Sequence, residues 1–399
     1  MRRRWARFFA AFLPAVCVAA ALVPPAHAAP PQTHPFYQPP SPLPPGNPGD
    51  LIRHEEITAY ADPAKTLRLD AHSWRIMYHS TSATGERIAV TGSYFVPKGI
   101  YLGKRPLVAF AVGTKGLGDL CAPSWGLTLG QDYEGLAIKS YLEKGWAVVV
   151  TDYEKLGTPG DHTYMVGQSQ GRVVLDALRA AVRFPRYGAR PDAPMAVVGY
   201  SQGGASAGWA AQLHPSYAPE LPVKGVAAGG TPADLDAVAK SLDGSPFFMF
   251  LAAAAVGLTS AYPELPFEEH LNEKGRELLE DGRDDCLAEA IPKGIGKRMS
   301  DFVDVDLLNT PAWQARLKEN RLGGVAPAMP VLMYHSLIDE IIPFAQAKTL
   351  RAEWCGKGAN LEWRQYLRGE HAALMYTALG PTQQWIEDRL KGRSTDGNC

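Results

Sequence analysis

The sequence lacks an excess of charge of either sign. Among its 399 residues, 40 are Lys or Arg and 41 are Asp or Glu, so the formal net charge is −1. A surface that binds nucleic acid carries clustered basic charge. We therefore expect no nucleic-acid partner. Hydrophobic residues make up 46% of the chain, which is typical of a globular protein.

Motifs that hold metals or nucleotides are also missing. The chain contains neither the C-x-x-C nor the H-E-x-x-H spacing of zinc sites. Its Gly-rich segment Gly113-Thr114-Lys115-Gly116 matches neither of the glycine patterns that cradle nucleotide phosphates. The sequence therefore predicts no zinc site, and hence no metal, and no nucleotide-binding loop.

Long hydrophobic runs are confined to the N-terminus. Arginines precede the apolar run Phe8 to Val23, and Ala26-His27-Ala28 has the small residues of a cleavage site. This pattern predicts a secretory signal peptide over residues 1–28 and therefore a secreted protein, extracellular or periplasmic. The alternative is a membrane anchor, although Pro14 interrupts the run.

Cysteine is scarce, with five residues in the chain, of which Cys17 lies in the predicted signal peptide. The even number that remains suggests two disulfides in an oxidising compartment. Sequence alone does not choose among their possible pairings. These cysteines are Cys121, Cys286, Cys355 and Cys399.

Apolar runs of strand length alternate with segments of helical periodicity from about residue 75 onward. Such runs fit strands that are buried on both faces of a sheet, and the alternation predicts an α/β fold with a mostly parallel sheet. One segment, 231–328, contains no good strand. We therefore predict a Pro-rich arm (29–50), a sheet core (51–230), an inserted helical cap (231–328) and the rest of the core (329–399).

The most specific motif is Gly199-Tyr200-Ser201-Gln202-Gly203, which matches G-x-S-x-G. This pattern is typical of a strand-to-helix turn that exposes a nucleophilic serine. The apolar run Met195 to Tyr200 precedes it, and a segment of small residues follows it. We interpret Ser201 as a nucleophile.

A serine nucleophile needs a histidine to accept its proton and a carboxylate to orient that histidine. Asp339 and His371 both follow predicted strands, in the chain order Ser, Asp, His that this turn accompanies. Glu340 beside Asp339 is expected to point elsewhere. His335 lies on a predicted strand and is interpreted as a core residue, and His162 lies in a loop near the site.

Acyl transfer also requires an oxyanion hole, in which backbone N–H groups face the developing charge. The residue after the nucleophile, Gln202, and the loop residue Lys115 are the expected donors. The apolar segment Phe247 to Leu258 admits two interpretations, as the wall of an acyl-chain tunnel or as a helix that fills the core of the cap.

From Leu51 onward the chain resembles the secretory lipase family of secreted α/β-hydrolases. The resemblance implies an α/β-hydrolase fold, catalytic Ser201, Asp339 and His371, no cofactor, and the disulfides Cys121–Cys286 and Cys355–Cys399. Yeast members carry an acidic residue in place of Lys115 and Gly in place of Gln202. The motifs that carry the resemblance are Cys121-Ala122-Pro123-Ser124, Asp152-Tyr153-Glu154, Gly160-Asp161-His162, Gly199 to Gly203, and Ser336 to Asp339 with Pro343.

These observations predict a secreted serine ester hydrolase of the lipase or carboxylesterase type. Its substrate is an ester or lipid, with transient contact to a lipid interface. Two alternatives stay open at this point: a serine peptidase on the same fold, and a non-catalytic binding module that kept the fold.

Overall fold

The computed structural model describes residues 31–399. The predicted signal peptide, residues 1–28, lies outside these described residues. Within 31–399, no helix combines the length and the apolar character that crossing a membrane requires.

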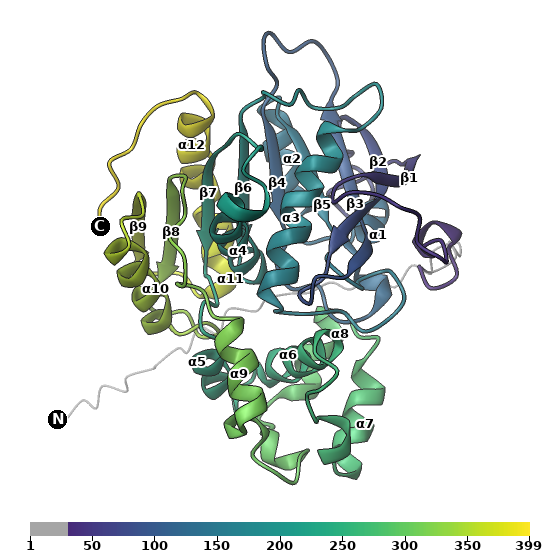
Figure 1. Ribbon diagram of the computed structural model, residues 1–399, viewed down its shortest axis with the longest axis vertical. Helices are drawn as coiled ribbons and strands as arrows, with labels where there is room; N and C mark the ends of the chain where they lie inside the picture. Colours follow the sequence, from purple (N-terminus) through teal and green to yellow (C-terminus); the bar gives the residue numbers. More distant parts are fainter. Residues whose placement is uncertain (1–30) are drawn as a thin grey trace, which may run out of the picture.

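A nine-stranded sheet forms the centre of the molecule, with the strand order β1-β2-β3-β5-β4-β6-β7-β8-β9 (Figure 1). The pairs from β5 through β4 to β9 are parallel, whereas β1, β2 and β3 pair antiparallel. The predicted α/β class is therefore confirmed. The strands are β1 Leu51–Glu56, β2 Ala71–Thr81, β3 Arg87–Pro97, β4 Leu107–Ala111, β5 Ala147–Thr151, β6 Met195–Tyr200, β7 Val223–Gly229, β8 Val331–Ser336 and β9 Leu361–Tyr366.

The central strands are buried on both faces, which explains their uninterrupted apolar sequences. Every residue of β4, β5 and β6 is buried. Helices α3 and α4 pack together on one face, and α2 and α12 pack on the other. The helices of this core are α1 Pro123–Leu129, α2 Gly135–Glu143, α3 Gly167–Val182, α4 Gln202–Tyr217, α10 Phe344–Gly356, α11 His371–Thr377 and α12 Leu379–Leu390.

Between β7 and β8 the chain leaves the sheet and forms a group of helices at one end of it, at the bottom of Figure 1. Apolar side chains of these helices form two clusters, around Trp313 and around Phe248, which also include core residues such as Met165 and Ile342. Helix α6 is apolar on all sides, from Phe248 to Leu258. The helices are α5 Leu235–Leu242, α6 Phe248–Ala261, α7 Glu273–Gly282, α8 Leu287–Gly294 and α9 Pro311–Glu319.

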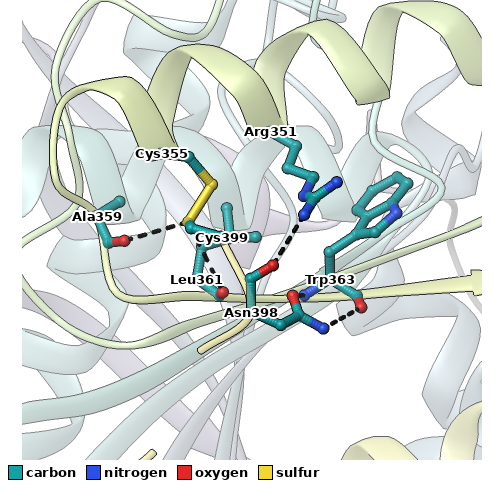
Figure 2. The surroundings of a disulfide bond; sticks show 7 residues. All are labelled: Arg351, Cys355, Ala359, Leu361, Trp363, Asn398 and Cys399. Atoms are coloured by element: carbon teal, nitrogen blue, oxygen red, sulfur yellow. Dashed lines mark hydrogen bonds between the residues drawn. A yellow bond between two sulfur atoms is a disulfide. The ribbon is translucent and has the colours of Figure 1, made fainter. Parts of the chain in front are cut away.

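Two disulfides fasten distant segments. Cys121 is joined to Cys286 between the core and the helical insertion, and Cys355 on α10 is joined to Cys399. Figure 2 shows that Asn398 lies beside Trp363 of the edge strand β9, whose backbone N–H it accepts at 2.6 Å. The C-terminal segment therefore covers an edge that would otherwise present unpaired backbone groups.

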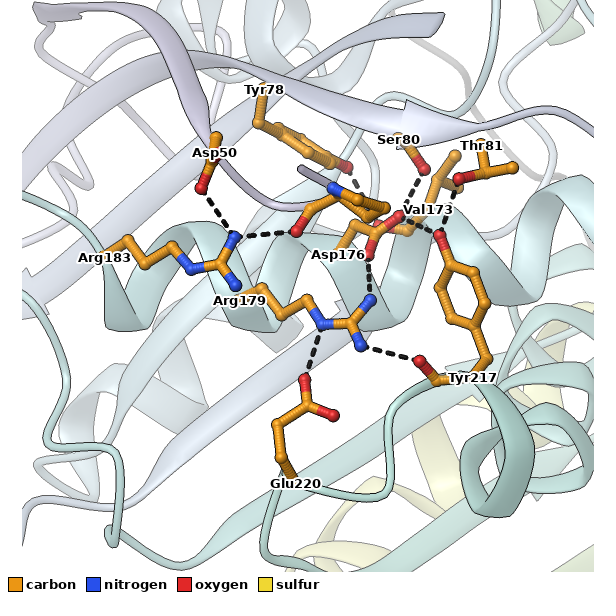
Figure 3. A network of polar contacts seen from close by, with 11 residues as sticks. Asp50, Tyr78, Ser80, Thr81, Val173, Asp176, Arg179, Arg183, Tyr217 and Glu220 are labelled. Carbon is orange, nitrogen blue, oxygen red and sulfur yellow. Dashed lines mark hydrogen bonds and ion pairs between the residues drawn. The ribbon is translucent and has the colours of Figure 1, made fainter. Parts of the chain in front are cut away.

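A buried carboxylate ties the antiparallel part of the sheet to two helices. The side chain of Asp176 on α3 accepts hydrogen bonds from Ser80 on β2 and Tyr217 on α4, both at 2.7 Å (Figure 3). Arg179 donates to the same carboxylate at 2.8 Å. Beside this network, Arg183 binds Asp50 at 2.8 Å and thereby holds the end of the N-terminal arm.

The variant Asp176→Ala is expected to lower the free energy of unfolding by about 2–4 kcal/mol, because it removes a buried acceptor shared by Ser80, Tyr217 and Arg179. Urea unfolding followed by circular dichroism measures the change. The matched control is Asp388→Ala, since Asp388 pairs with Arg393 at the surface; its loss is expected to cost below about 1 kcal/mol. Equal effects of the two variants would contradict this account of the network.

Several elements differ from the sequence-based prediction. Strand β1 and helices α1 and α2 were not predicted. Strand β1 lacks an apolar run because it lies at the edge of the sheet, and four of its six residues are charged or polar. Near the C-terminus, α11 and α12 are two separate helices that meet at Ala378. His371, which was expected to follow a strand, is the first residue of α11.

Candidate active site

Ser201 occupies a strained turn between β6 and α4. Its φ and ψ angles are 59° and −123°, and its N–H donates to Gly229 O at 2.9 Å. A Cβ at Gly199 would lie 2.0 Å from Gly203 O, and a Cβ at Gly203 would lie 2.0 Å from Ala111 O. Only glycine fits at both positions, so the motif is required by the packing of the turn. Such strain is typical of functional sites.

The structure brings Asp339 and His371 into contact. The Nδ1 atom of His371 lies 2.7 Å from Asp339 Oδ2, and both side chains are buried. Because a carboxylate only accepts, Nδ1 carries the proton of the neutral imidazole and Nε2 has a free lone pair. This Nε2 is buried and has no hydrogen-bond partner among residues 31–399. It is therefore poised to accept a proton from a donor that approaches it.

His371 lies beside the turn that carries Ser201. The hydroxyl of Tyr200 donates to His371 O at 2.8 Å, and the two rings are 5.0 Å apart between centroids. A Cβ at Gly230 would lie 3.1 Å from Cε1 of His371, and the neighbouring Gly229 accepts the N–H of Ser201. The imidazole is thus packed against Tyr200, which precedes Ser201, and close to Gly230 at the end of β7.

Four N–H groups surround the carboxylate of Asp339. Oδ1 accepts from the backbone of Ile341 at 3.1 Å and of Ile342 at 2.8 Å. Oδ2 accepts from His371 and also lies 3.3 Å from Nε2 of His335. Burial alone would raise the pKa of Asp339, but the hydrogen bonds from these two histidines hold it well below its usual range. The carboxylate therefore stays ionised beside His371.

Two neighbours of the predicted residues have contacts that the sequence did not reveal. His335 is buried on β8, as expected of a core residue, but its Nε2 bonds Ile342 O at 2.9 Å and approaches Asp339. The expectation that Glu340 points away is wrong, since its carboxylate accepts the backbone N–H of His371 at 2.8 Å. Both contacts depend on how the loop after β8 turns, which no local motif specifies.

The side chain of Lys115 points into the protein, so only its backbone could face a substrate. Its Nζ lies 2.6 Å from Asp132 and 2.9 Å from Glu134, and all three side chains are buried. Burial alone would lower the pKa of Lys115, but the two carboxylates raise it above its usual value. Glu134 also accepts the N–H of Gly113 at 2.8 Å. This buried ion cluster fixes the loop Gly113 to Lys115.

The side chain of Gln202 is hydrogen-bonded to His162. Nδ1 of His162 donates to Glu154 O at 2.9 Å, because a carbonyl oxygen can only accept. The other ring nitrogen of His162 is then an acceptor, and the side-chain amide of Gln202 lies 3.3 Å from it. Burial lowers the pKa of His162 to about 4, which keeps the ring neutral near pH 7. The N–H of Gln202 is the first of α4 and has no partner within the helix.

An apolar pocket of about 630 Å³ opens onto Ser201 and Gln202. Helix α6 provides one wall, with Leu251, Ala254 and Leu258 facing the space. Other walls come from α5, α9 and the loop after β8. The lining contains no charged side chain, so the pocket fits a ligand that is held by apolar burial.

Comparisons with known proteins identify the family of this chain. The model of the secretory lipase family matches residues 122–398. A secreted triacylglycerol lipase of Malassezia globosa is 30% identical over 92% of this chain and 83% of its own. A Mycobacterium tuberculosis protein named as a probable inactive lipase is 29% identical over 91% of this chain and 83% of its own.

Solved structures support the same placement. Candida antarctica lipase A in its closed state is 27% identical, with a TM-score of 0.85 over 93% of this chain and 89% of that one. A rice cell-wall-degrading esterase from Xanthomonas oryzae, 19% identical, shares the fold with a TM-score of 0.68 over 86% of this chain and 98% of its own. The chain therefore belongs to the secretory lipase family, a family of carboxylic-ester hydrolases with the α/β-hydrolase fold.

Proposed function

We propose that the protein hydrolyses carboxylic esters of the lipase type through the triad Ser201, His371 and Asp339. The observation that carries the proposal is the 2.7 Å contact between His371 and Asp339, next to a strained serine turn at the end of an apolar pocket. A serine hydroxyl is a weak nucleophile by itself, and a neutral imidazole with a free Nε2 supplies the base that it needs.

In the acylation step, Ser201 Oγ attacks the ester carbonyl while its proton passes to Nε2 of His371. The carbonyl oxygen becomes an oxyanion, which accepts hydrogen bonds from the N–H groups of Lys115 and Gln202. When the tetrahedral intermediate collapses, the C–O bond to the alcohol breaks. His371 gives its proton to the leaving alcohol, and an acyl-serine ester remains.

Deacylation repeats the same transfers with water in place of serine. Water gives a proton to Nε2 of His371 and attacks the acyl carbonyl, and the second intermediate returns the proton to Ser201 Oγ as the carboxylic acid leaves. Throughout both steps, Asp339 holds the ring orientation and stabilises the imidazolium that forms transiently. No atom outside the chain, the ester and water is needed.

The pocket beside α6 is proposed to hold the acyl chain. Replacing Ala254 with Phe places a large side chain in its wall. We expect kcat/KM for p-nitrophenyl laurate to fall at least about tenfold, because several methylenes lose their apolar surroundings. Hydrolysis of p-nitrophenyl butyrate should change much less. Equal losses for both esters would show that the acyl chain lies elsewhere.

His335 is proposed to position Asp339. The variant His335→Leu removes a donor to a buried carboxylate, so kcat/KM is expected to fall about tenfold or more. The matched variant His335→Gln keeps an N–H group and should restore most of the activity. A pH profile of kcat/KM separates this role from a structural one, since a defect in folding alone would leave the profile in place. Identical behaviour of the two variants would contradict the role.

A serine peptidase is the second enzyme that such a triad could serve. A peptidase generally anchors a charged or polar part of its substrate, and the pocket lining offers no charged group. Incubation with aminoacyl-p-nitroanilides tests this alternative. A non-catalytic role is relevant because one relative is named as a probable inactive lipase; retention of all three triad residues in this chain favours activity.

We further propose that the protein is exported and acts outside the cytoplasm, in transient contact with a lipid interface. Two disulfides, the N-terminal signal pattern and relatives named as secreted lipases support export. Mass spectrometry of protein recovered from the culture medium or periplasm should find Ala29 at the N-terminus. Hydrolysis of emulsified triolein tests the interfacial contact.

A further inference from the structure

Two hydroxyl groups lie in the wall of the pocket at Ser201 without a role in the triad. The described residues that line this pocket carry three hydroxyls, those of Ser201, Thr114 and Tyr164. Thr114 and Tyr164 are buried, with exposed fractions of 7% and 5%. Their hydroxyl oxygens lie 2.8 Å apart. They therefore form a hydrogen-bonded pair in a wall that is otherwise mostly apolar.

Thr114 follows the end of β4, next to the turn that carries Ser201. Strands β4 and β6 are parallel neighbours in the sheet, so the segments that follow them lie side by side. A Cβ at Gly113 would lie 3.5 Å from the backbone oxygen of Tyr200. The residue before Thr114 is thus close to the residue before Ser201. This proximity places the Thr114 hydroxyl at the end of the pocket where the ester is attacked.

Tyr164 is the donor within the hydroxyl pair. A phenol is a stronger acid than an aliphatic alcohol and its oxygen is a weaker acceptor, so its O–H donates to Thr114 Oγ1. Burial raises the pKa of Tyr164 to about 12, which keeps this donor protonated near pH 7. The hydroxyl hydrogen of Thr114 is then left over. Within residues 31–399, Tyr164 is the one hydrogen-bond partner of the Thr114 hydroxyl.

The backbone around Thr114 is fixed before any substrate binds. The backbone oxygen of Thr114 accepts the hydroxyl of Tyr133 at 3.0 Å. The next backbone oxygen, of Lys115, accepts the N–H of Leu287 at the start of α8, at 2.8 Å. The buried ion cluster around the Lys115 side chain adds a third attachment. Donors that are held in place in advance stabilise a developing charge most effectively.

We propose that Thr114 is a further catalytic residue, whose hydroxyl donates a third hydrogen bond to the oxyanion beside the N–H groups of Lys115 and Gln202. This inference rests on the proposed ester hydrolysis and adds one donor to it. The negative charge on the carbonyl oxygen develops in the transition state and is absent from the bound ester. The hydroxyl therefore lowers the barrier more than it strengthens substrate binding.

The variant Thr114→Val tests this role, because it removes the hydroxyl and keeps the shape of the side chain. With p-nitrophenyl butyrate, kcat is expected to fall about 10²-fold, while KM changes less than about threefold. Thr114→Ser keeps a hydroxyl and should recover most of the lost rate. The matched control is Thr128→Val, since the Thr128 hydroxyl bonds Trp125 O within α1, and it should keep full activity.

Inhibition by butylboronic acid gives a readout that a merely structural defect would not produce. The boron atom bonds to the serine oxygen, and the tetrahedral boronate carries a negatively charged oxygen in the place of the oxyanion. Thr114→Val should weaken this inhibition by about the same factor as it lowers kcat/KM. Competitive inhibition by butyramide, whose carbonyl stays planar and uncharged, should change much less.

The variant Tyr164→Phe tests the direction of the hydrogen bond between the two hydroxyls. It removes the donor to Thr114 Oγ1 but leaves the hydrogen of Thr114 free, so kcat should fall less than about tenfold. A larger loss of kcat in Tyr164→Phe than in Thr114→Val would make Tyr164 the donor to the oxyanion. That result would overturn the assignment to Thr114.

The outcomes separate this inference from the proposed function. An active parent chain whose Thr114→Val variant stays within about threefold in kcat overturns the inference and leaves the triad in place. A Thr114→Ser variant as slow as Thr114→Val also overturns it. A parent chain that hydrolyses no ester overturns the proposed function, and the inference with it. Circular dichroism checks the folding of each variant, and Thr114→Ala, with the same expected loss, replaces Thr114→Val if that variant does not fold.

Discussion

Replacing Ser201 with alanine is expected to lower kcat for p-nitrophenyl butyrate by about 10⁶-fold. The substitution removes the only atom that forms the covalent bond to the acyl group. A water molecule that attacked the ester instead of Ser201 Oγ would react more slowly, because the strained turn fixes the position of Oγ but not that of water. The turnover number of purified protein, measured against the uncatalysed rate, checks the size of the loss.

The fold should survive this change. The backbone of the turn is held by the N–H of Ser201 on Gly229 O and by the close approach of Gly199 to Gly203, and alanine alters neither. The thermal midpoint is therefore expected to remain within a few degrees of that of the parent. Ser216→Ala, at an exposed position on the same helix α4, is the control and should keep full activity. A Ser201→Ala protein that still turns over esters would refute the nucleophile.

Asp339→Asn is expected to lower kcat about 10⁴-fold without unfolding the protein. Oδ1 of Asp339 accepts two backbone N–H groups, from Ile341 and Ile342. The carbonyl oxygen of Asn must take that position, which directs its NH₂ group toward His371. Facing a donor, Nδ1 of His371 becomes an acceptor and the proton moves to Nε2. The imidazole can then no longer accept the proton of Ser201.

Glu340→Gln is the matched control for this substitution. It also exchanges a carboxylate for an amide. Within residues 31–399 the Glu340 carboxylate accepts one hydrogen bond, from the backbone N–H of His371, and an amide oxygen can still accept it. Its effect on kcat should be less than about tenfold. Comparable losses in the two variants would show that charge near His371, and not the choice of tautomer, governs the rate.

Sequence reasoning was most successful where one physical cause dominates. Strands β4, β5 and β6 are buried on both faces, so their apolar runs mark them almost residue by residue. The turn at Ser201 allows only glycine two residues before and after it, which makes its motif specific. Strand β1 escaped prediction because an edge strand need not be apolar.

The parts that could not be predicted depend on contacts between segments far apart in the chain. Nothing in the sequence near Lys115 indicates that Asp132 and Glu134 bury its charge. The contact of His335 with Asp339 arises because the loop after β8 folds back over the strand. Likewise, the two faces of α6 look alike in sequence. One face lines the pocket at Ser201, and the other lines a separate apolar space between α6 and α7.

Labelling with a fluorophosphonate, followed by mass spectrometry, tests the central claim most directly. Such reagents form a stable bond only with a serine that a neighbouring base activates. The account predicts one adduct per chain, located on Ser201, absent in Ser201→Ala and formed much more slowly in His371→Ala. An unlabelled Ser201 in a protein that hydrolyses esters, or an adduct on another residue, would contradict it.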